Sequence, residues 1–248
     1  AGVSSKSAIT RGLPRLKELL QLSKNLKSPS TIINLKEKNV NNKYIKNIAN
    51  NIILIKIEDI ISASNIYFDP DDTNTIVDED KQLLDNYIKF QNDFGIDDYI
   101  YNTSNKCPLI LRLIFNKYKM LDKNISMIDI YNVLLQNFGD KIHCLYSDDN
   151  QEKLIFRIRY KDAFNPLNDD LDNLKILENN ILKTKLSGIQ NITNIDTNKE
   201  TLYEVITTNT INKGEIIEYE STILETFGTN LLDILCLDYV DTTKTYSN

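Results

Sequence analysis

Apolar residues recur at the three-to-four-residue spacing of a helix face in several segments of the chain. The first segment begins at Leu13 with Pro14 in its first turn, and its leucine stripe predicts a helix that ends at Ser28. Ser126 precedes another segment of this kind and Gly139 follows it, as an N-cap and a C-terminal glycine typically do. The same reasoning predicts further helices over 42–53, 79–90, 172–186 and 231–235.

Alternation of apolar and polar residues marks the expected strands. The clearest case is a hairpin in which alternation runs over 142–146, Asp148–Asn150 supplies the turn, and alternation resumes over 154–158. Arg157 and Arg159 leave the same face of the second strand, and we interpret them as surface charges. Further strands are expected over 31–35, 60–68 and 109–115 and between 192 and 227. Helices mixed with mostly antiparallel strands indicate an α+β fold.

Charge is distributed unevenly along the chain, whose formal net charge is −6. Residues 1–38 contain eight basic and two acidic residues, whereas 58–98 contain twelve acidic and two basic residues. A basic stretch attracts phosphate backbones and an acidic stretch repels them, but two solvated faces explain the charges equally simply. No run of about 18 apolar residues occurs, so we expect no membrane span.

The residues by themselves predict neither an active site nor a metal site. The three cysteines are widely spaced and are expected to be small buried hydrophobes, and His143 is the only histidine, expected to be packed or at the surface. A calcium loop starting at Asp69 would need Gly and Glu where Asn74 and Asp80 stand, so this acidic cluster is interpreted as a solvated turn. Phosphate-binding glycine loops and the HExxH motif are absent from the sequence.

Short residue runs spread along the chain carry a family resemblance. These runs are AGVSSK and TRGLPRLKEL within 1–19, KNLKSPS over 24–30, ASNIYFDP over 63–70, LRL over 111–113, YSDDN and EKLIFR within 146–157, LSGIQNI over 186–192, GTNLLDIL over 228–235 and VDTTK over 240–244. In this order they resemble the largest subunit of multisubunit DNA-directed RNA polymerase, of the eukaryotic polymerase II type. Thr242 and Lys244 depart from the Pro and Arg of that family, and 39–51 and 83–105 match it poorly.

The resemblance implies a domain organisation. Residues 1–54 correspond to the C-terminal half of the trigger loop and a cleft segment, 55–160 to the jaw, and 161–248 to a second cleft segment. The expected fold is α+β, a jaw domain of mixed or antiparallel strands and helices inserted between the two cleft segments. Both ends are expected to be cut from a longer chain. The parent enzyme is a nucleotidyltransferase that uses Mg²⁺ bound elsewhere, so we expect no cofactor and no catalytic residue here.

The resemblance also implies binding partners. Residues expected near downstream DNA are Lys6, Arg11, Lys24, Asn25 and Lys27. The other expected partners are the second-largest subunit, a small zinc-ribbon subunit and the transcript-cleavage factor, and an exposed jaw strand could accept a partner strand. From the acidic stretch we further expect Asp71, Asp72 and Asp78–Asp80 to bind basic partners.

Two alternatives remain open from the residues alone: a stand-alone protein-interaction module, and a nucleic-acid-binding regulator that uses the basic N-terminal helix. As part of a polymerase the chain would reside in the nucleus. Its Asn-, Ile- and Lys-rich composition also suits a large DNA virus, for which the expected location is the virion or a viral factory in the host cytoplasm.

Overall fold

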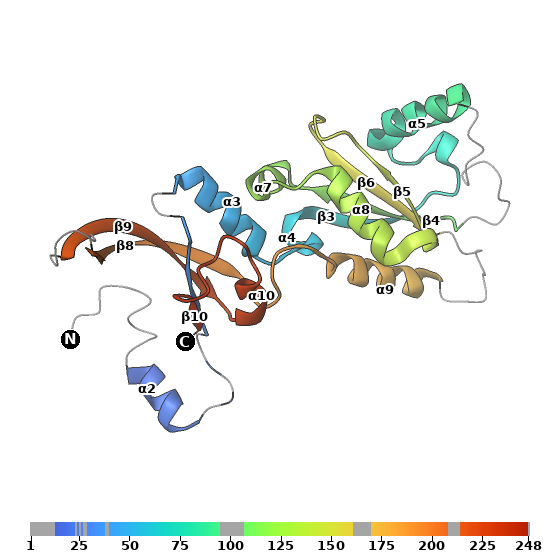
Figure 1. Ribbon diagram of the computed structural model, residues 1–248. Helices are drawn as coiled ribbons and strands as arrows, with labels where there is room; N and C mark the ends of the chain where they lie inside the picture. Colours follow the sequence, from blue (N-terminus) through green and yellow to red (C-terminus); the bar gives the residue numbers. More distant parts are fainter. Residues whose placement is uncertain are drawn as a thin grey trace. The chain divides into compact units, whose positions relative to one another are not determined.

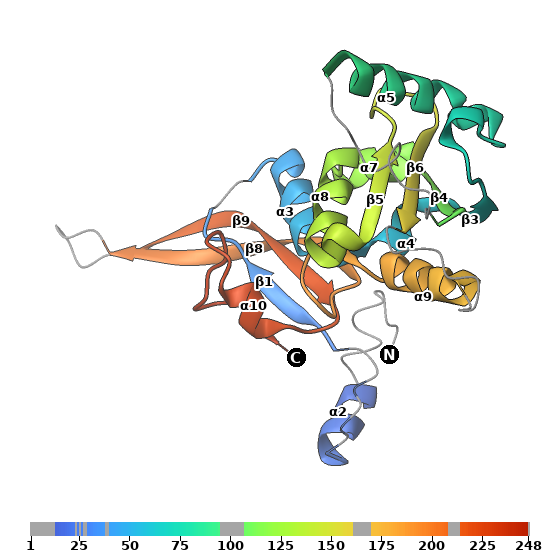
Figure 2. The same ribbon diagram turned by 90° about the vertical axis from the view of Figure 1, so that its right-hand side faces the viewer.

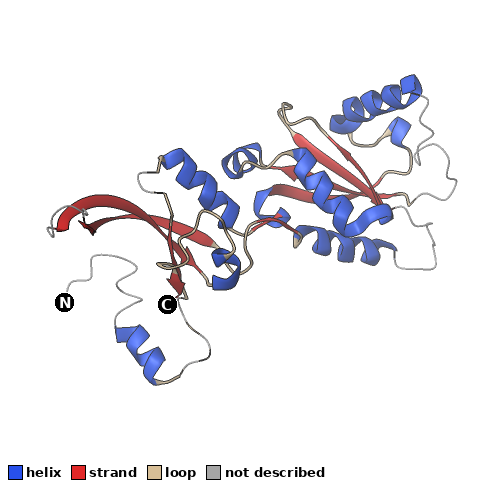
Figure 3. Ribbon diagram, viewed as in Figure 1, coloured by secondary structure: helices blue, strands red, loops and turns tan. Residues whose placement is uncertain are grey.

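The chain divides into two compact units in a computed structural model that describes residues 13–22, 24, 26, 29–37, 40–94, 107–160, 170–207 and 214–247. Unit 2 is the continuous segment Ile55–Leu186, and unit 1 combines Ala1–Leu54 with Ser187–Asn248. Unit 2 is therefore inserted into unit 1 along the chain (Figure 1). Antiparallel sheets and helices make up both units, which confirms the α+β fold (Figure 3).

Unit 2 is built on a four-stranded antiparallel sheet with the strand order β3-β4-β6-β5. Its elements in chain order are β2 (Ile55–Lys56), α4 (Ile57–Ile60), β3 (Ile61–Phe68), η1 (Asp72–Asn74), η2 (Asp78–Asp80), α5 (Lys81–Phe94), β4 (Leu109–Phe115), α7 (Lys117–Lys123), α8 (Met127–Phe138), η3 (Gly139–Lys141), β5 (Ile142–Tyr146), β6 (Leu154–Tyr160), α9 (Asp170–Leu182) and β7 (Lys185–Ser187). The β5–β6 hairpin and the capping box of Ser126 and Asp129 at the start of α8 confirm the corresponding predictions.

Unit 2 continues past residue 160, where the predicted jaw ends, and the boundary of the jaw itself stays a prediction. Helix α9 belongs to unit 2, where it packs against β4 and α4, and Glu178 contacts the Ser64 hydroxyl of β3. Strand β7 pairs with β2, so the last elements of unit 2 return to the strand with which it begins. The inserted unit therefore extends to Leu186.

One face of this sheet is apolar. Leu113 of β4 lies opposite Phe156 of β6, and neither side chain is exposed. The ring of Tyr146 on β5 stacks on Phe156 with centroids 5.5 Å apart, and Tyr131 of α8 contacts Tyr146 at 5.3 Å. Helix α8 thus covers the apolar face. A row of contacting aromatic rings, the aromatic ladder, runs from Phe156 in the core to Tyr146 on β5 and Tyr131 on α8.

The opposite face of the same sheet is ionic. Arg157 donates hydrogen bonds to Asp69 at 2.9 Å and to Asp80 at 2.8 Å, and Arg112 Nε donates to Asp80 Oδ1 at 2.9 Å. Arg159 pairs with Asp72 and also donates to the Cys107 carbonyl at 2.7 Å. The arginine and aspartate side chains of this network are at most 5% exposed. Buried charges need this degree of pairing, because unpaired ions are costly to remove from water.

Two sequence-based interpretations of these residues are wrong, and a third is corrected in part. Arg157 and Arg159 are not surface charges, and the cluster at Asp69 is not a solvated turn. Asp72 and Asp80 neutralise the chain's own arginines, so they present no charge to a basic partner, whereas for the rest of the acidic stretch the binding of basic partners stays a prediction. Strand alternation placed both arginines on one face correctly, but it could not show that 69–80 folds back over that face.

Charge pairing shifts the pKa values of two residues of the network. Burial alone would lower the pKa of Arg157, but the hydrogen bonds to Asp80 and Asp69 and the charges of Asp80 and Asp72 together outweigh burial and raise the pKa above its ordinary value. At the rim of the network, hydrogen bonds from Lys153 and then Arg112 lower the pKa of Glu79. At pH values above its ordinary pKa, the ionised Glu79 carboxylate therefore stabilises the folded state. This stabilisation is lost as pH falls through the lowered pKa of Glu79.

Unit 1 contains a second four-stranded antiparallel sheet with the order β10-β1-β9-β8. Its elements are α2 (Leu13–Leu20), β1 (Thr31–Asn34), α3 (Asn42–Ile52), β8 (Asn194–Thr207), β9 (Gly214–Phe227), α10 (Leu231–Leu235) and β10 (Tyr246–Ser247). All four residues of β1 are buried. The core of unit 1 consists of buried aliphatic residues from both of its chain segments: Ile33, Leu35, Ile45, Ile48, Ile52, Ile189, Ile192, Leu224, Ile234 and Val240.

Helix α2 is shorter than the leucine pattern predicts. It ends at Leu20, and Leu22 adopts a positive φ of 49°, which an α-helix cannot continue through. The leucine side chains at 16, 19 and 20 are more than half exposed. The stripe that predicted a longer helix is therefore not buried by the part of the chain that the structure describes.

Close backbone contact joins the two chain segments of unit 1 at Gly188. This residue has a φ of +90°, and a Cβ atom there would lie 1.9 Å from the Ile53 carbonyl oxygen. The Ile189 amide donates to the Ile52 carbonyl at 2.9 Å, and the Leu54 amide donates to the Ile192 carbonyl at 2.9 Å. Only glycine allows the segments to approach this closely.

We predict that Asp80→Asn destabilises unit 2 by about 3–5 kcal/mol, because it breaks buried ion pairs to Arg112 and Arg157. Urea unfolding followed by circular dichroism measures the loss. The matched control is Asp78→Asn, since the Asp78 side chain is 88% exposed and pairs only with Lys81 among the ion pairs described. Equal midpoints for both variants would contradict a structural role for the network.

We also predict that Gly188→Ala displaces the Ile53 backbone and costs unit 1 at least about 3 kcal/mol, since overpacking adds to the strain of a positive φ. Amide hydrogen exchange of the peptide covering 45–54 should accelerate. Gly139→Ala is the control, because Gly139 also has a positive φ, at 54°, but its Cβ would have no neighbour within 4 Å. Unchanged exchange in Gly188→Ala would disprove the close approach.

Candidate functional site

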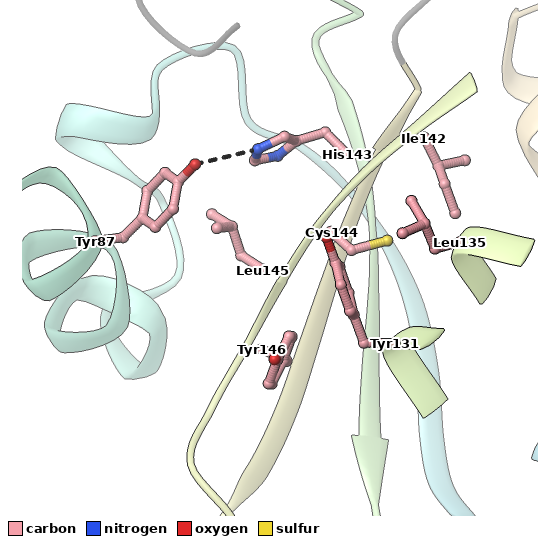
Figure 4. A pocket seen from close by; sticks show the side chains of 8 residues that line it. All are labelled: Tyr87, Tyr131, Leu135, Ile142, His143, Cys144, Leu145 and Tyr146. Carbon is pink, nitrogen blue, oxygen red and sulfur yellow. Dashed lines mark hydrogen bonds between the residues drawn. The ribbon is translucent and has the colours of Figure 1, made fainter. Parts of the chain in front are cut away.

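A hollow of about 500 Å³ follows the outer strand of the unit 2 sheet (Figure 4). We call it the edge groove, and its lining residues are Tyr87, Tyr131, Leu135, Ile142, His143, Cys144, Leu145 and Tyr146. They include every residue of β5, together with side chains of α5 and α8. Consecutive side chains of a strand point to opposite faces, so the groove wraps around both faces of β5.

The backbone of β5 is oriented toward the groove at alternate residues. The Ser147 amide donates to the Ile155 carbonyl at 2.9 Å, which makes this a hydrogen-bonded pair of the antiparallel ladder. Alternation then directs the backbone groups of His143 and Leu145 toward β6 and those of Ile142 and Tyr146 away from it. Within the described residues β5 is the last strand in the sheet order, and its five residues span roughly 17 Å.

One wall of the edge groove is formed by α5. Its sheet-facing side carries Asp80 just before the helix, then Leu84, Tyr87 and Gln91, at the spacing of a single helix face. Gln91 Nε2 donates to the Tyr87 hydroxyl at 3.0 Å, and that hydroxyl lies 3.4 Å from His143 Nε2. Because the Gln91 amide nitrogen only donates, the Tyr87 proton can be directed to the histidine (Figure 4).

The position of this wall depends on the ionic network. Asp80 is bound to Arg112 and Arg157, and α5 begins at the next residue. Leu84 then packs against Leu145 of β5, and the rings of Tyr87 and His143 meet edge-on with centroids 6.0 Å apart. The buried arginines therefore determine where the α5 wall stands relative to β5.

The other wall is formed by α8, and it is aromatic. Tyr131 and Leu135 face Cys144 and Tyr146, and the Leu135 side chain is 46% exposed. Burial raises the pKa of Tyr146, with further contributions from Tyr131 and Asp149, so this phenol stays protonated near neutral pH. Figure 2 shows α5 and α8 on opposite sides of β5, so the two walls flank one strand.

The predicted DNA-contacting residues are only partly within the described structure. Lys24 is exposed, whereas Lys6, Arg11, Asn25 and Lys27 lie outside the described residues. The DNA-contacting role of all five residues therefore stays a prediction.

Sequence reasoning missed the aromatic residues of the groove. His143 lines the groove beside Tyr87, and the spacing of Asp80, Leu84 and Tyr87 is the signal that would have placed α5 against β5. Among the cysteines, Cys107 is buried as expected, but Cys236 is exposed, which corrects that expectation.

The described residues contain no group of three or more His, Cys, Asp or Glu side chains placed to hold a metal ion. Within the same residues, no helix combines the length and apolar character needed to cross a membrane.

Comparison with known families identifies the inserted unit. A sequence model of the family described as RNA polymerase Rpb1, domain 7, matches residues 55–189, which is more than half of the chain. The match begins at the first residue of unit 2 and includes β5 and both walls of the edge groove. The chain therefore belongs to the RNA polymerase Rpb1 domain 7 family and is part of the largest subunit of a DNA-directed RNA polymerase.

Proposed function

We propose that unit 2 is the jaw of the polymerase and that it docks a smaller subunit by accepting a β-strand along β5. The edge groove is the observation that carries this proposal, because it follows the last strand in the described sheet order and is lined by side chains from both faces of that strand. Strand addition uses the same two components: backbone groups provide affinity, and pockets for alternate side chains provide specificity.

The groove suits a strand better than a small substrate. Its volume lies within the range of about 300–1,000 Å³ for ligand pockets, so a small molecule is the natural alternative. However, His143 and Cys144 are consecutive residues of a strand, so they leave opposite faces and cannot form a nucleophile–base pair. A strand, in contrast, would use both faces and the outward backbone of Ile142 and Tyr146.

For the partner we propose the small zinc-ribbon subunit, which the family resemblance associates with the jaw. Unit 1 would then form the cleft segments on either side of the jaw in the sequence and support the trigger loop. The second-largest subunit and the transcript-cleavage factor are proposed as further contacts of the assembled enzyme. The Mg²⁺ chemistry of RNA synthesis would be supplied by parts of the subunit outside this chain.

Basic residues before β1 would guide downstream DNA. Lys24 is exposed, and a lysine ammonium contacts phosphate irrespective of base sequence. This contact would add to many others in the assembled polymerase, so the chain by itself should bind duplex DNA only weakly. Strong binding by the chain alone would instead favour an independent nucleic-acid-binding regulator.

We predict that the zinc-ribbon subunit slows amide hydrogen exchange in the peptide covering β5, because a new strand would bond to the outward amides of Ile142 and Tyr146. Leu135→Trp should weaken binding by at least about tenfold, since the larger ring fills the groove beside β5. Calorimetry measures the affinity.

The control for this experiment is Ile176→Trp on α9. Its side chain is 59% exposed and does not line the edge groove, so binding should stay within twofold of the unmodified chain, about the error expected for a neutral surface change. If the subunit binds without protecting β5, or binds both variants alike, docking along β5 is disproved.

We predict that the double change Lys24→Gln and Lys27→Gln decreases the steepness of the negative slope of log affinity against log salt by about 1.8, since each lost phosphate contact removes about 0.9. Fluorescence anisotropy with a labelled duplex at several salt concentrations measures the slope. Lys89→Gln with Lys175→Gln, two exposed lysines of unit 2, is the control and should leave it unchanged. An equal decrease in both double variants would show nonspecific charge loss rather than a local DNA contact.

A further inference from the structure

Unit 2 has a second hollow, which is distinct from the edge groove. Its volume is about 330 Å³, and it is lined by α7, by the start of α8 and by residues of the β5–β6 hairpin. We call it the α7 hollow, and its lining residues are Lys117, Met120, Leu121, Asn124, Ile125, Ser126, Asp129, Asp149 and Leu154. The two hollows share no lining residue, so each can be considered by itself.

The α7 hollow has a buried apolar base and an exposed apolar rim. Met120 and Leu154 are each 2% exposed and form the base. Leu121 lines the same hollow but is 69% exposed, and Tyr118 is 86% exposed. These two side chains are three residues apart on α7, so they are neighbours on the helix surface. Exposed apolar side chains beside a hollow are typical of a protein interaction site.

Two carboxylates line the α7 hollow beside the start of α8. Asp129 Oδ2 accepts a hydrogen bond from the Ser126 amide at 2.9 Å. Asp149 Oδ1 accepts one from the Met127 amide at 2.9 Å, and because the two amides belong to consecutive residues, the carboxylates lie close together. Neither carboxylate belongs to an ion pair among the described residues. Capping hydrogen bonds leave the charge of each carboxylate in place.

The positive groups around the hollow do not cancel this charge. Lys117 is the one cation among the lining residues, and its ammonium donates to the carbonyls of Asn150 at 3.2 Å and Gln151 at 2.9 Å. The start of α8 contributes roughly half a positive charge. Two carboxylates exceed these contributions, so the lining remains negative.

An arginine side chain matches this combination of apolar and acidic surface. Its aliphatic stem can lie along Leu121 and Met120, because long cationic side chains bury their stems against apolar surface. Its planar guanidinium carries five N–H donors, which can reach two carboxylates at once. The volume is near the lower end of the range of about 300–1,000 Å³ for binding pockets, so it suits individual side chains. A nucleic acid would instead bring phosphates toward carboxylates.

We infer that the α7 hollow docks another polypeptide, which inserts an arginine flanked by apolar side chains. The guanidinium binds Asp129 and Asp149, while the flanking side chains cover Leu121 and Tyr118. Residues 55–186 contain 16 basic and 23 acidic residues, a net charge of −7, and this field speeds the association of a basic segment. The inference does not depend on strand docking along β5, since the two hollows have no residue in common.

Methyl NMR of the full chain tests the inference directly. The sequence contains two methionines, so ¹³C labelling of their methyl groups gives two signals. Met120 lines the α7 hollow, whereas Met127 does not and is the internal reference. The probes are the acetylated and amidated heptapeptide SGLRLGS and the same peptide with citrulline, which keeps the shape of arginine without its charge. SGLRLGS should shift the Met120 signal and bind about fivefold more tightly than the citrulline peptide.

Two pairs of variants separate the charged from the apolar contribution. Asp149→Asn should remove most of the preference for arginine, because the amide oxygen still accepts from the Met127 amide but the charge is gone. Asp148→Asn is its control, since this neighbouring carboxylate is also exposed but does not line the hollow. Leu121→Ala should weaken both peptides at least about threefold, whereas Leu232→Ala on α10, where the side chain is 79% exposed, should leave both unchanged.

Each contrary result overturns the inference. Equal affinity for the two peptides, or equal effects of Asp149→Asn and Asp148→Asn, would show that the carboxylates of the hollow do not recognise a cation. A Met120 signal that stays fixed as the peptide binds would place binding elsewhere on the chain. A Met120 signal that moves with chain concentration before any peptide is added would show that a second copy of the chain fills the hollow instead.

Discussion

Three buried guanidinium groups on one face of a sheet are the constraint on which unit 2 depends. Arg112, Arg157 and Arg159 cannot be covered by apolar side chains without a large desolvation cost, so the covering segment has to bring carboxylates. The segment 69–80 brings them, and its closing turn leads directly into α5. Ion pairing therefore determines where α5 packs along one edge of the sheet, in addition to stabilising the fold.

The two faces of the sheet consequently serve different purposes around β5. The apolar face supplies a rigid core, and its aromatic ladder ends at the surface in Tyr146 and Tyr131. The ionic face supplies a polar wall with Tyr87 and His143. A strand that lies between two chemically distinct walls can distinguish the two sides of an incoming chain, which a flat sheet edge cannot do. Because the chain belongs to a family of RNA polymerase largest subunits, its partners include other subunits of that enzyme.

Local patterns predicted most elements, because their signals lie within a few residues. The alternation around the turn at Asp148 and the caps at Ser126 and Asn230 gave the hairpin and the two helices with nearly correct bounds. Long-range placement was not predictable in the same way. Nothing close to Arg157 in the sequence shows that Asp69, 88 residues earlier, returns to pair with it, so a network was mistaken for separate surface charges. The edge groove was missed for the same reason, since α5 and β5 are distant in the chain.

The insertion of unit 2 has a consequence for the order in which the chain folds. All of Ile55–Leu186 is contiguous, so this unit can fold as soon as it leaves the ribosome. Strand β1, by contrast, lies between β9 and β10, and its buried residues must wait for partners synthesised about 190 to 216 residues later. Until then the apolar side chains of β1 and α3 lack the partners that bury them in the folded unit, and the late closure of unit 1 is the slow step expected from its nonlocal contacts.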